Sequence, residues 1–182
     1  MDKEKQDCAA DGEQRIIDYG KIHIIGSVGS GKTTLAKKLA KKTGIPHFEL
    51  DNVVWERHPS GDRRRSEAER IKRLGEIVQG DRWIVEGVHN ELWVDESFER
   101  ADVILFLDPP YRVRTYRIVK RYMRQKLGLE TSHYKPAFAV FRSMFKWNRH
   151  FENKGKPHFF QRYGTYEQKI RIIKGHLKGG FK

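Results

Sequence analysis

A run of glycines and hydroxyl residues carries the clearest chemical signal in this sequence. Its nine residues match the pattern G-x-x-x-x-G-K-[ST] and extend it by one threonine: Gly26, Ser27, Val28, Gly29, Ser30, Gly31, Lys32, Thr33 and Thr34. Glycines let the backbone curve around phosphates, and successive N–H groups then point at the anion. We therefore expect a nucleoside triphosphate here, with Lys32 on the β and γ phosphates and Thr33 on Mg²⁺.

The segments on either side of this loop are those that phosphate binding requires. Residues 22–25 read as a short buried strand that ends at the loop. Beyond the loop, Leu35, Ala36 and Leu39 recur at helical spacing, and Gly44 followed by Pro46 signals the end of the helix. The order strand, loop, helix places the loop at a helix N-terminus, where the helix dipole favours an anion.

Apolar segments continue to alternate with helical ones, which predicts a parallel sheet covered on both faces. The expected strands are 22–25, 47–50, 82–86, 102–107 and 169–173. The predicted fold class is therefore α/β, a P-loop NTPase with a five-stranded, parallel, doubly wound sheet. Ligands of such sheets bind beyond the carboxyl ends of the strands, and an acid follows or ends three of these strands: Asp51, Glu86 and Asp108.

Each of these acids has a chemical and a structural interpretation. Asp51 could accept the proton of an alcohol acceptor, a role that an ionised phosphate acceptor does not need, or it could cap the segment that follows. Glu86 is expected beside Thr33, where it would organise Mg²⁺; the alternative is a buried carboxylate bonded to backbone amides. Asp108 precedes two prolines and could simply end its strand, or it could act at the site like the other two acids.

Two segments between the strands look inserted. Residues 52–80 are expected to cover a substrate, with Trp55 and Arg57 as candidate contacts and a helix around Leu74. Residues 111–160 form a basic, aromatic, lid-like segment with predicted helices over 111–126 and 136–150.

Arginines are regularly spaced on the first of these two helices. Arg114, Arg117, Arg121 and Arg124 are separated by 3, 4 and 3 residues, which puts four guanidiniums on one face. Phosphoryl transfer needs such cations around the transferred group, although a solvated basic face is the alternative. Arg142 and Arg149 on the next helix are candidates to close over the same site.

Charge is distributed unevenly along the 182 residues. The formal net charge is +13, and residues 111–182 carry 19 Lys and Arg but only 3 Asp and Glu. The same part holds 14 of the 21 aromatic residues. A phosphorylated small molecule or a polyanion is therefore the expected partner, and nucleic acid is a second possibility.

The N-terminal residues, the cysteine count and the length of the apolar stretches indicate where the protein is expected to reside. Residues 1–20 read as a polar leader without the apolar core of a signal peptide, and the chain has a single cysteine, Cys8. No apolar stretch reaches the length of a membrane span. We expect a cytoplasmic protein that is a monomer or a weak dimer, with one kinase-like domain over residues 21–182.

The order of these motifs resembles the adenylate-kinase-like P-loop kinases. The segments that carry the likeness are GSVGSGKTT, Phe-Glu-Leu-Asp51, Trp-Ile-Val-Glu86-Gly87, Val-Ile-Leu-Phe-Leu-Asp108 and Arg117-Ile-Val-Lys-Arg121. Within these kinases the chain is most similar to the DNA topology modulation proteins. The resemblance implies that Glu86 holds Mg²⁺ through water, that Arg117 lies against the nucleotide base and that Arg121 contacts phosphate.

The resemblance also has departures. Many relatives have Asn after the acid-Gly pair, where this chain has Val88, with Asn90 two positions later, and the typical adenylate kinase lid sequence is missing. The acceptor therefore need not be AMP. No guanine-selective Asn-Lys-x-Asp segment is present, which favours ATP.

Two functions follow from the sequence. The first is an Mg²⁺-dependent kinase that moves the γ-phosphoryl group of ATP to a small acceptor, a nucleotide or a nucleoside-like metabolite, with Lys32, Asp51, Arg117 and Arg121 as catalytic residues. The alternative is a nucleotide-regulated nucleic-acid-binding protein that affects DNA topology.

Overall fold

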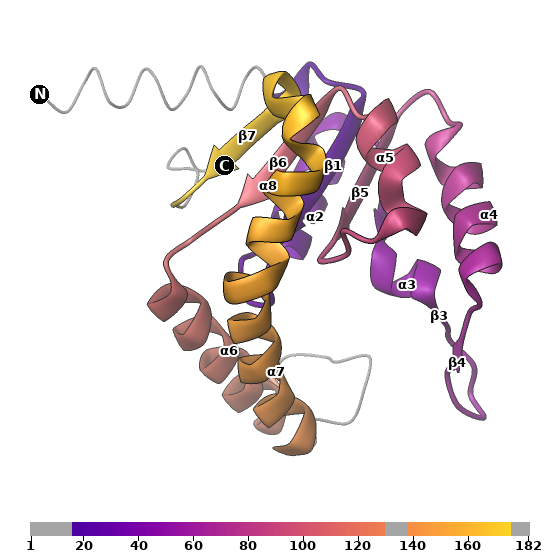
Figure 1. Ribbon diagram of the computed structural model, residues 1–182. Coiled ribbons are helices and arrows are strands. Elements are labelled where there is room, and N and C mark those ends of the chain that lie inside the picture. Colours follow the sequence, from indigo (N-terminus) through magenta and orange to yellow (C-terminus); the bar gives the residue numbers. More distant parts are fainter. Residues whose placement is uncertain (1–15, 130–137, 176–182) are drawn as a thin grey trace, which may run out of the picture.

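A parallel sheet forms the centre of the computed structural model, which describes residues 16–129 and 138–175 (Figure 1). Its strand order is β2-β5-β1-β6-β7, with every neighbouring pair parallel. The strands are β1 (Lys21–Gly26), β2 (His47–Glu49), β5 (Trp83–Gly87), β6 (Val103–Leu107) and β7 (Ile170–Ile173). All five predicted strands are confirmed, with bounds that differ by about one residue at each end.

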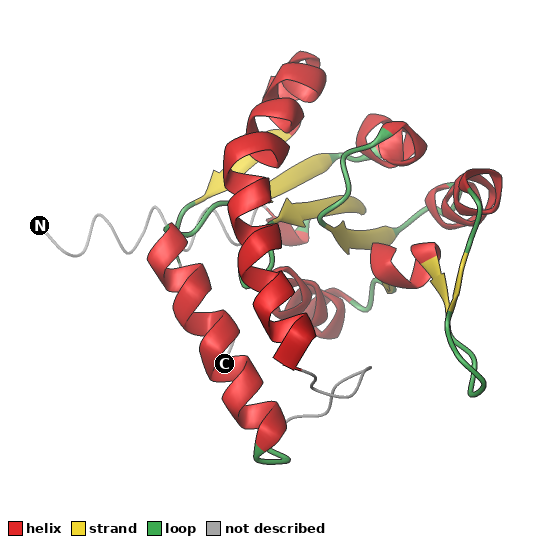
Figure 2. Ribbon diagram, turned by 60° about the horizontal axis from the view of Figure 1, so that its bottom comes forward, coloured by secondary structure: helices red, strands yellow, loops and turns green. Residues whose placement is uncertain are grey.

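Helices connect the strands and cover both faces of the sheet (Figure 2). They are α2 (Lys32–Thr43), α3 (Leu50–Val54), α4 (Glu67–Val78), α5 (Asp95–Arg100), α6 (Tyr111–Lys126), α7 (Phe138–His150) and α8 (Lys156–Tyr163). Shorter elements are the hairpin strands β3 (Trp55–Glu56) and β4 (Arg63–Arg64), the 3-10 turns η1 (Leu92–Val94) and η3 (Gly164–Lys169), and the π-helical turn η2 (Phe151–Gly155).

The alternation of side chains along the strands divides the core into two layers. Ile24 of β1 belongs to a cluster with Leu35 and Leu39 of α2. Its neighbour Ile25 belongs to the opposite cluster, which includes Phe98 of α5 and residues of α3, α4 and α8. Because β1 is buried on both faces and central in the sheet, the loop that follows it stands on a rigid support.

The helical segment after β6 leaves the sheet and returns to it. Helix α6 runs away from the strand ends and packs beside α7; α7, η2 and α8 then continue as one helical rod back across the sheet (Figures 1 and 2). The predicted helices over 111–126 and 136–150 correspond to α6 and α7. Residues 151–160 do not belong to a lid as expected, because Phe151 and Phe159 are buried in the main core.

The end of the predicted leader is also part of the folded domain. Residues 1–15 lie outside the described residues, but Ile16 is buried against the α2 side of the sheet and Tyr19 packs beside it. The leader therefore ends before Ile16 and not at residue 20. In the described part of the chain, no helix combines the length and apolar character needed to cross a bilayer.

Candidate active site

The glycine-rich loop joins β1 to α2 at the carboxyl edge of the sheet. Gly31 precedes the helix with φ +100°, and Gly29 has φ +75°, backbone conformations that favour glycine. A Cβ on Gly29 would also lie 2.8 Å from the carbonyl oxygen of Arg114, so α6 packs directly on the loop. The Nζ of Lys32 donates to the carbonyl oxygen of Ser27 at 3.1 Å, which folds the lysine back over the loop.

Thr33 and Glu86 meet across the gap between α2 and β5. The Oγ1 of Thr33 donates to Oε1 of Glu86 at 2.5 Å, and Glu86 is buried. The expectation that these two residues lie together therefore agrees with the geometry. Carboxylate and hydroxyl oxygens are the donors that Mg²⁺ prefers, so the pair fits that ion chemically.

Lys32 and Glu86 carry opposite charges, but their mutual attraction does not fully offset the effect of burial on their pKa values. Burial raises the pKa of Glu86, against the opposing effects of the Lys32 ammonium and the Thr33 hydrogen bond. Burial lowers the pKa of Lys32, while Glu86 and Asp51 oppose this shift and Arg121 adds to it. A site that destabilises both charges in this way is typical of one completed by a charged ligand.

Arg117 of α6 binds the loop itself. Its Nη1 donates to the carbonyl oxygen of Ser30 at 2.8 Å and lies 3.4 Å from that of Gly29. Arg121, one turn further along, directs its Nη2 toward the sulfur of Met144 at 3.5 Å. Both arginines are half-buried, at the boundary between α6 and the loop.

The prediction of one face with four guanidiniums around the site is wrong in part, because the other two arginines have different environments. Arg114 is 1% exposed and forms an ion pair with Glu152 of η2, so it contributes to the packing of α6 and not to an open cationic surface. Arg124 is exposed near the end of α6. Helical spacing placed the four residues on one face correctly, but tertiary packing gave them different environments.

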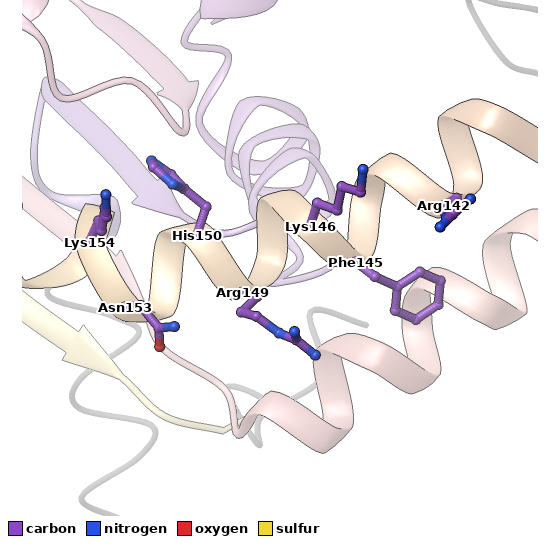
Figure 3. A pocket seen from close by; sticks show the side chains of 7 residues that line it. All are labelled: Arg142, Phe145, Lys146, Arg149, His150, Asn153 and Lys154. Atoms are coloured by element: carbon purple, nitrogen blue, oxygen red, sulfur yellow. The ribbon is translucent and has the colours of Figure 1, made fainter.

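Helix α7 touches the loop through a different residue from those expected. The buried Asn148 accepts a hydrogen bond from Ser27 at 3.0 Å through its Oδ1. Arg142 and Arg149 instead line a groove of about 660 Å³ on the outer side of α7 (Figure 3). At 100° per residue the two arginines lie on a different face of α7 from Met144 and Asn148, and neither donates a hydrogen bond to the loop among the described residues.

Asp51 is the second residue of the short helix α3 (Leu50–Val54), which follows β2. The predicted strand over 47–50 ends at Glu49, and Asp51 lies in the first turn of α3 with 67% of its side chain exposed. His89 lies between two acids: its Nε2 is 3.5 Å from Oδ1 of Asp51, and its Nδ1 is 3.3 Å from Oε2 of Glu91. The contact with His89 holds the pKa of Asp51 below its usual range.

The two candidate substrate contacts of residues 52–80 lie at the start of the β3–β4 hairpin. Trp55 is 37% exposed, and Arg57 forms an ion pair with Asp62 inside the hairpin connection. The predicted helix around Leu74 is α4, which begins with a capping box between Ser66 and Glu69. Arg57 is near enough to lower the pKa of Asp51, but its guanidinium already has a partner.

Asp108 does more than end its strand. The Nζ of Lys156 in α8 donates to its carboxylate at 2.5 Å, and the same ammonium is 4.0 Å from Glu152. Glu152 in turn pairs with Arg114. These four side chains link β6, α6, η2 and α8 behind the loop.

The fold thus brings together some predicted residues and adds others. Lys32, Thr33, Glu86 and Arg117 converge on the loop, while Asp51 and Arg121 are close enough to influence Lys32. Sequence reasoning missed His89, although the rule of inspecting strand ends could have found it three residues after Glu86. It missed Asn148 and Glu152 because no local pattern distinguishes them from other polar helix residues.

Comparison with known proteins agrees with this geometry. The family described as "AAA domain" (AAA_18) matches residues 22–134, which include the loop, Glu86 and α6. The chain belongs to this AAA domain family. Individual curated proteins are also similar: the chain is 27% identical to the uncharacterized protein YqaC of Bacillus subtilis (strain 168) over 74% of each chain.

Several further relatives are kinases of small molecules. The chain is 23% identical to adenylate kinase isoenzyme 1 of Cyprinus carpio over 59% of this chain and 66% of that protein. It is 30% identical to a cytidylate kinase of Pyrococcus horikoshii over 55% of this chain and 56% of that one. These kinase alignments span less than two thirds of the relatives' lengths.

A solved structure extends the likeness to the whole fold. Shikimate kinase from Acinetobacter baumannii, in complex with shikimate, superposes with a TM-score of 0.50 at 13% identity, over 91% of this chain and 90% of that one. The predicted P-loop α/β fold is confirmed, and the kinase relatives bear out the general prediction of a P-loop kinase. The narrower resemblance to DNA topology modulation proteins stays a prediction.

Proposed function

We propose that the AAA domain protein transfers the γ-phosphoryl group of ATP to a small acceptor, a nucleotide or a nucleoside-like metabolite. The observation that carries this proposal is the convergence of Lys32, Thr33, Glu86 and Arg117 on one loop at the carboxyl edge of the sheet. Kinases of the adenylate, cytidylate and shikimate types among the relatives support the same reaction class.

Different residues of the site would carry out different parts of such a reaction. The loop N–H groups and Lys32 would hold the phosphates, and Arg117 and Arg121 would add positive charge beside the transferred group. Thr33 and Glu86 would hold Mg²⁺, which supplies neutralisation of charge on the phosphate oxygens when bound. Asp51, Trp55 and Arg57 would contact the acceptor, and the exposed side chains of Asp51 and Trp55 support this assignment.

Turnover of Mg²⁺-ATP across a panel of acceptors tests this function. The panel contains AMP, CMP, adenosine, cytidine and shikimate, with a control that lacks any acceptor. We expect at least one acceptor class to raise ADP formation well above the control and to yield a phosphorylated product. ATP that binds but is never transferred, with every acceptor and with EDTA making no difference, would contradict the proposal.

Nucleic-acid binding is the second candidate function, and the groove on α7 favours it. Arg142, Lys146, Arg149, His150 and Lys154 line this groove together with Phe145 and Asn153 (Figure 3). None of these five basic side chains has an acidic partner among the described residues, and Phe145 is the aromatic residue that lines the groove with them. Cations without acidic partners next to an aromatic ring suit a phosphate backbone.

The double variant Lys146→Ala, Arg149→Ala separates the two functions. If the groove binds DNA, affinity for a duplex should fall, and the slope of log K against log salt should become shallower by about two. Turnover of ATP should not change, because neither substituted side chain has a hydrogen bond to the loop among the described residues. DNA affinity that is unaffected by the variant would remove this candidate.

A further inference from the structure

His89 has a more specific environment than a surface histidine requires. Its ring stacks obliquely on Trp93 at a centroid distance of 5.2 Å, and only 19% of its side chain is exposed. Its two nitrogens face two carboxylates, Asp51 at 3.5 Å and Glu91 at 3.3 Å. An imidazole between two acids can bond to both only when both nitrogens carry protons, so the geometry selects the imidazolium.

The pKa of His89 also favours the imidazolium. Burial disfavours the charged ring, but the contacts to Asp51 and Glu91 outweigh burial and raise the pKa of His89 to about 9. The imidazolium in turn holds Asp51 ionised, helped by Lys32 and Arg57. Within the described residues, these three cations are the charged groups that lower the pKa of the Asp51 carboxyl.

Most arginines of residues 52–80 are already engaged. Five of the six donate to acids or carbonyl oxygens of the same segment: Arg57, Arg63, Arg65, Arg70 and Arg73. Arg64 has no such contact among the described residues, so a second phosphate would find one uncommitted guanidinium in this segment. The exposed carboxylate of Asp51 is instead suited to a neutral hydroxyl group.

We propose that the acceptor presents a hydroxyl group to Asp51, and that His89, held by Glu91 and Trp93, is the positioning residue that orients this carboxylate. The proposal rests on the kinase function proposed above and names its acceptor chemistry. In the transfer, the acceptor oxygen forms a bond to the γ-phosphorus as the bond to the β–γ bridging oxygen breaks. The hydroxyl proton passes to the Asp51 carboxylate, and ADP leaves with the electron pair of the broken bond.

The low basicity of Asp51 is compatible with this step. In a loose phosphoryl transition state the hydroxyl keeps its proton until late, so the carboxylate has to be correctly placed and ionised more than strongly basic. His89 provides both conditions, since its ring fixes one carboxylate oxygen and its charge keeps the group ionised.

A titration of the protein without substrates tests the pair directly. Carboxyl-¹³C NMR follows Asp51 in the native chain, in His89→Gln and in the matched control His58→Gln. The exposed ring of His58 hydrogen-bonds to Ser60 in the β3–β4 connection and to no other residue of the described chain. Loss of the imidazolium should raise the pKa of Asp51 by about one unit or more. His58→Gln should leave it unchanged. An unchanged Asp51 in His89→Gln, or an equal shift in the control, would overturn the positioning role.

Kinetics then test the acceptor class, with adenosine, cytidine and shikimate as hydroxyl acceptors and AMP and CMP as phosphate acceptors. Activity with a hydroxyl acceptor, and an acid limb of kcat that moves to higher pH in His89→Gln with little change in KM for ATP, is the expected result. Phosphorylation of AMP or CMP on phosphate alone would overturn the hydroxyl proposal and leave the kinase intact. Absence of transfer to all five compounds would count against the proposed function and this acceptor class, while the titration would still decide the His89–Asp51 contact.

Discussion

The two sides of the candidate site differ in how firmly they are built. On the donor side, the loop is held by a central strand, by Arg117 from α6 and by Asn148 from α7. On the proposed acceptor side, Asp51 is largely exposed on a five-residue helix, and its carboxylate contacts His89. On the donor side, several elements therefore hold the conformation of the phosphate loop, whereas few contacts fix the side chains of the acceptor side.

This difference has a physical reason. Phosphate binding uses backbone groups that only one loop conformation presents correctly, so surrounding elements must hold that conformation. In the proposed function, acceptor binding would use side chains at the ends of β2 and β5, which can be exchanged without disturbing the sheet. A stable scaffold with an exchangeable edge allows one fold to serve different acceptors.

The largest effect is expected from the donor side. Replacing Lys32 with Ala should reduce turnover to background and remove most ATP affinity, because the ammonium contacts phosphates in a loop whose backbone stays in place without it. Far-UV circular dichroism and Tm should stay native. Lys37→Ala, on the exposed face of the same helix, is the control and should keep full activity. Normal ATP turnover by folded Lys32→Ala would break the assignment of the donor side.

The next effect concerns the acceptor side. With a hydroxyl acceptor, Asp51→Asn should lower kcat by roughly 10²–10⁴ and leave ATP binding nearly unchanged, because the variant keeps the shape but cannot take the proton. The exposed Asp81, at the other end of the sheet, supplies the control Asp81→Asn. A small loss seen only in KM for the acceptor would show that the two sides do not divide donor binding from proton acceptance.

Arg117 tests whether the donor side acts in catalysis as well as in structure. Arg117→Ala should lower kcat/KM by roughly 10²–10³, the scale of one preorganised transition-state contact, and Arg117→Lys should not restore it, because a lysine lacks the planar fork. Arg112→Ala, an exposed change on the same helix, should leave kcat/KM unaltered. A loss that is fully explained by a lower Tm would assign Arg117 to loop packing alone.

Much of the donor side could be predicted from sequence because its signals are local. The motif from Gly26 to Thr34, the strand before it and the helix after it are contiguous, and the alternation of strands gave the sheet. The predicted pairing of Thr33 with Glu86 followed from parallel topology, which brings strand ends together. Helical spacing likewise identified the face of α6 that meets the loop.

The remaining contacts depend on tertiary packing that spacing does not encode. Nothing in the pattern of α6 distinguishes Arg114, which is buried against Glu152, from Arg117, which binds the loop. The same is true of α7, where Asn148 and not Arg149 faces Ser27. The choice is made by the angle at which each helix returns to the sheet, and residues far apart in sequence determine that angle.

The smallest effect should come from Glu152, which supports the donor side from behind. Glu152→Gln leaves the guanidinium of Arg114 without its carboxylate, and two of its nitrogens, Nε and Nη1, already lack hydrogen-bond partners among the described residues. Because Glu152 itself is 36% exposed, we expect a loss of roughly 1–3 kcal/mol of unfolding free energy, less than for a fully buried pair. Urea denaturation measures this loss of stability, with the exposed Glu99→Gln as control.

If α6 is held mainly by the Arg114–Glu152 pair, Glu152→Gln should also weaken ATP binding, because Arg117 follows Arg114 by one turn and would lose its position on the loop. Equal stability of Glu152→Gln and Glu99→Gln would instead show that the Arg114–Glu152 pair does not hold α6 in place, and the support of the donor side would then rest on β1 and on the loop contacts of Arg117 and Asn148.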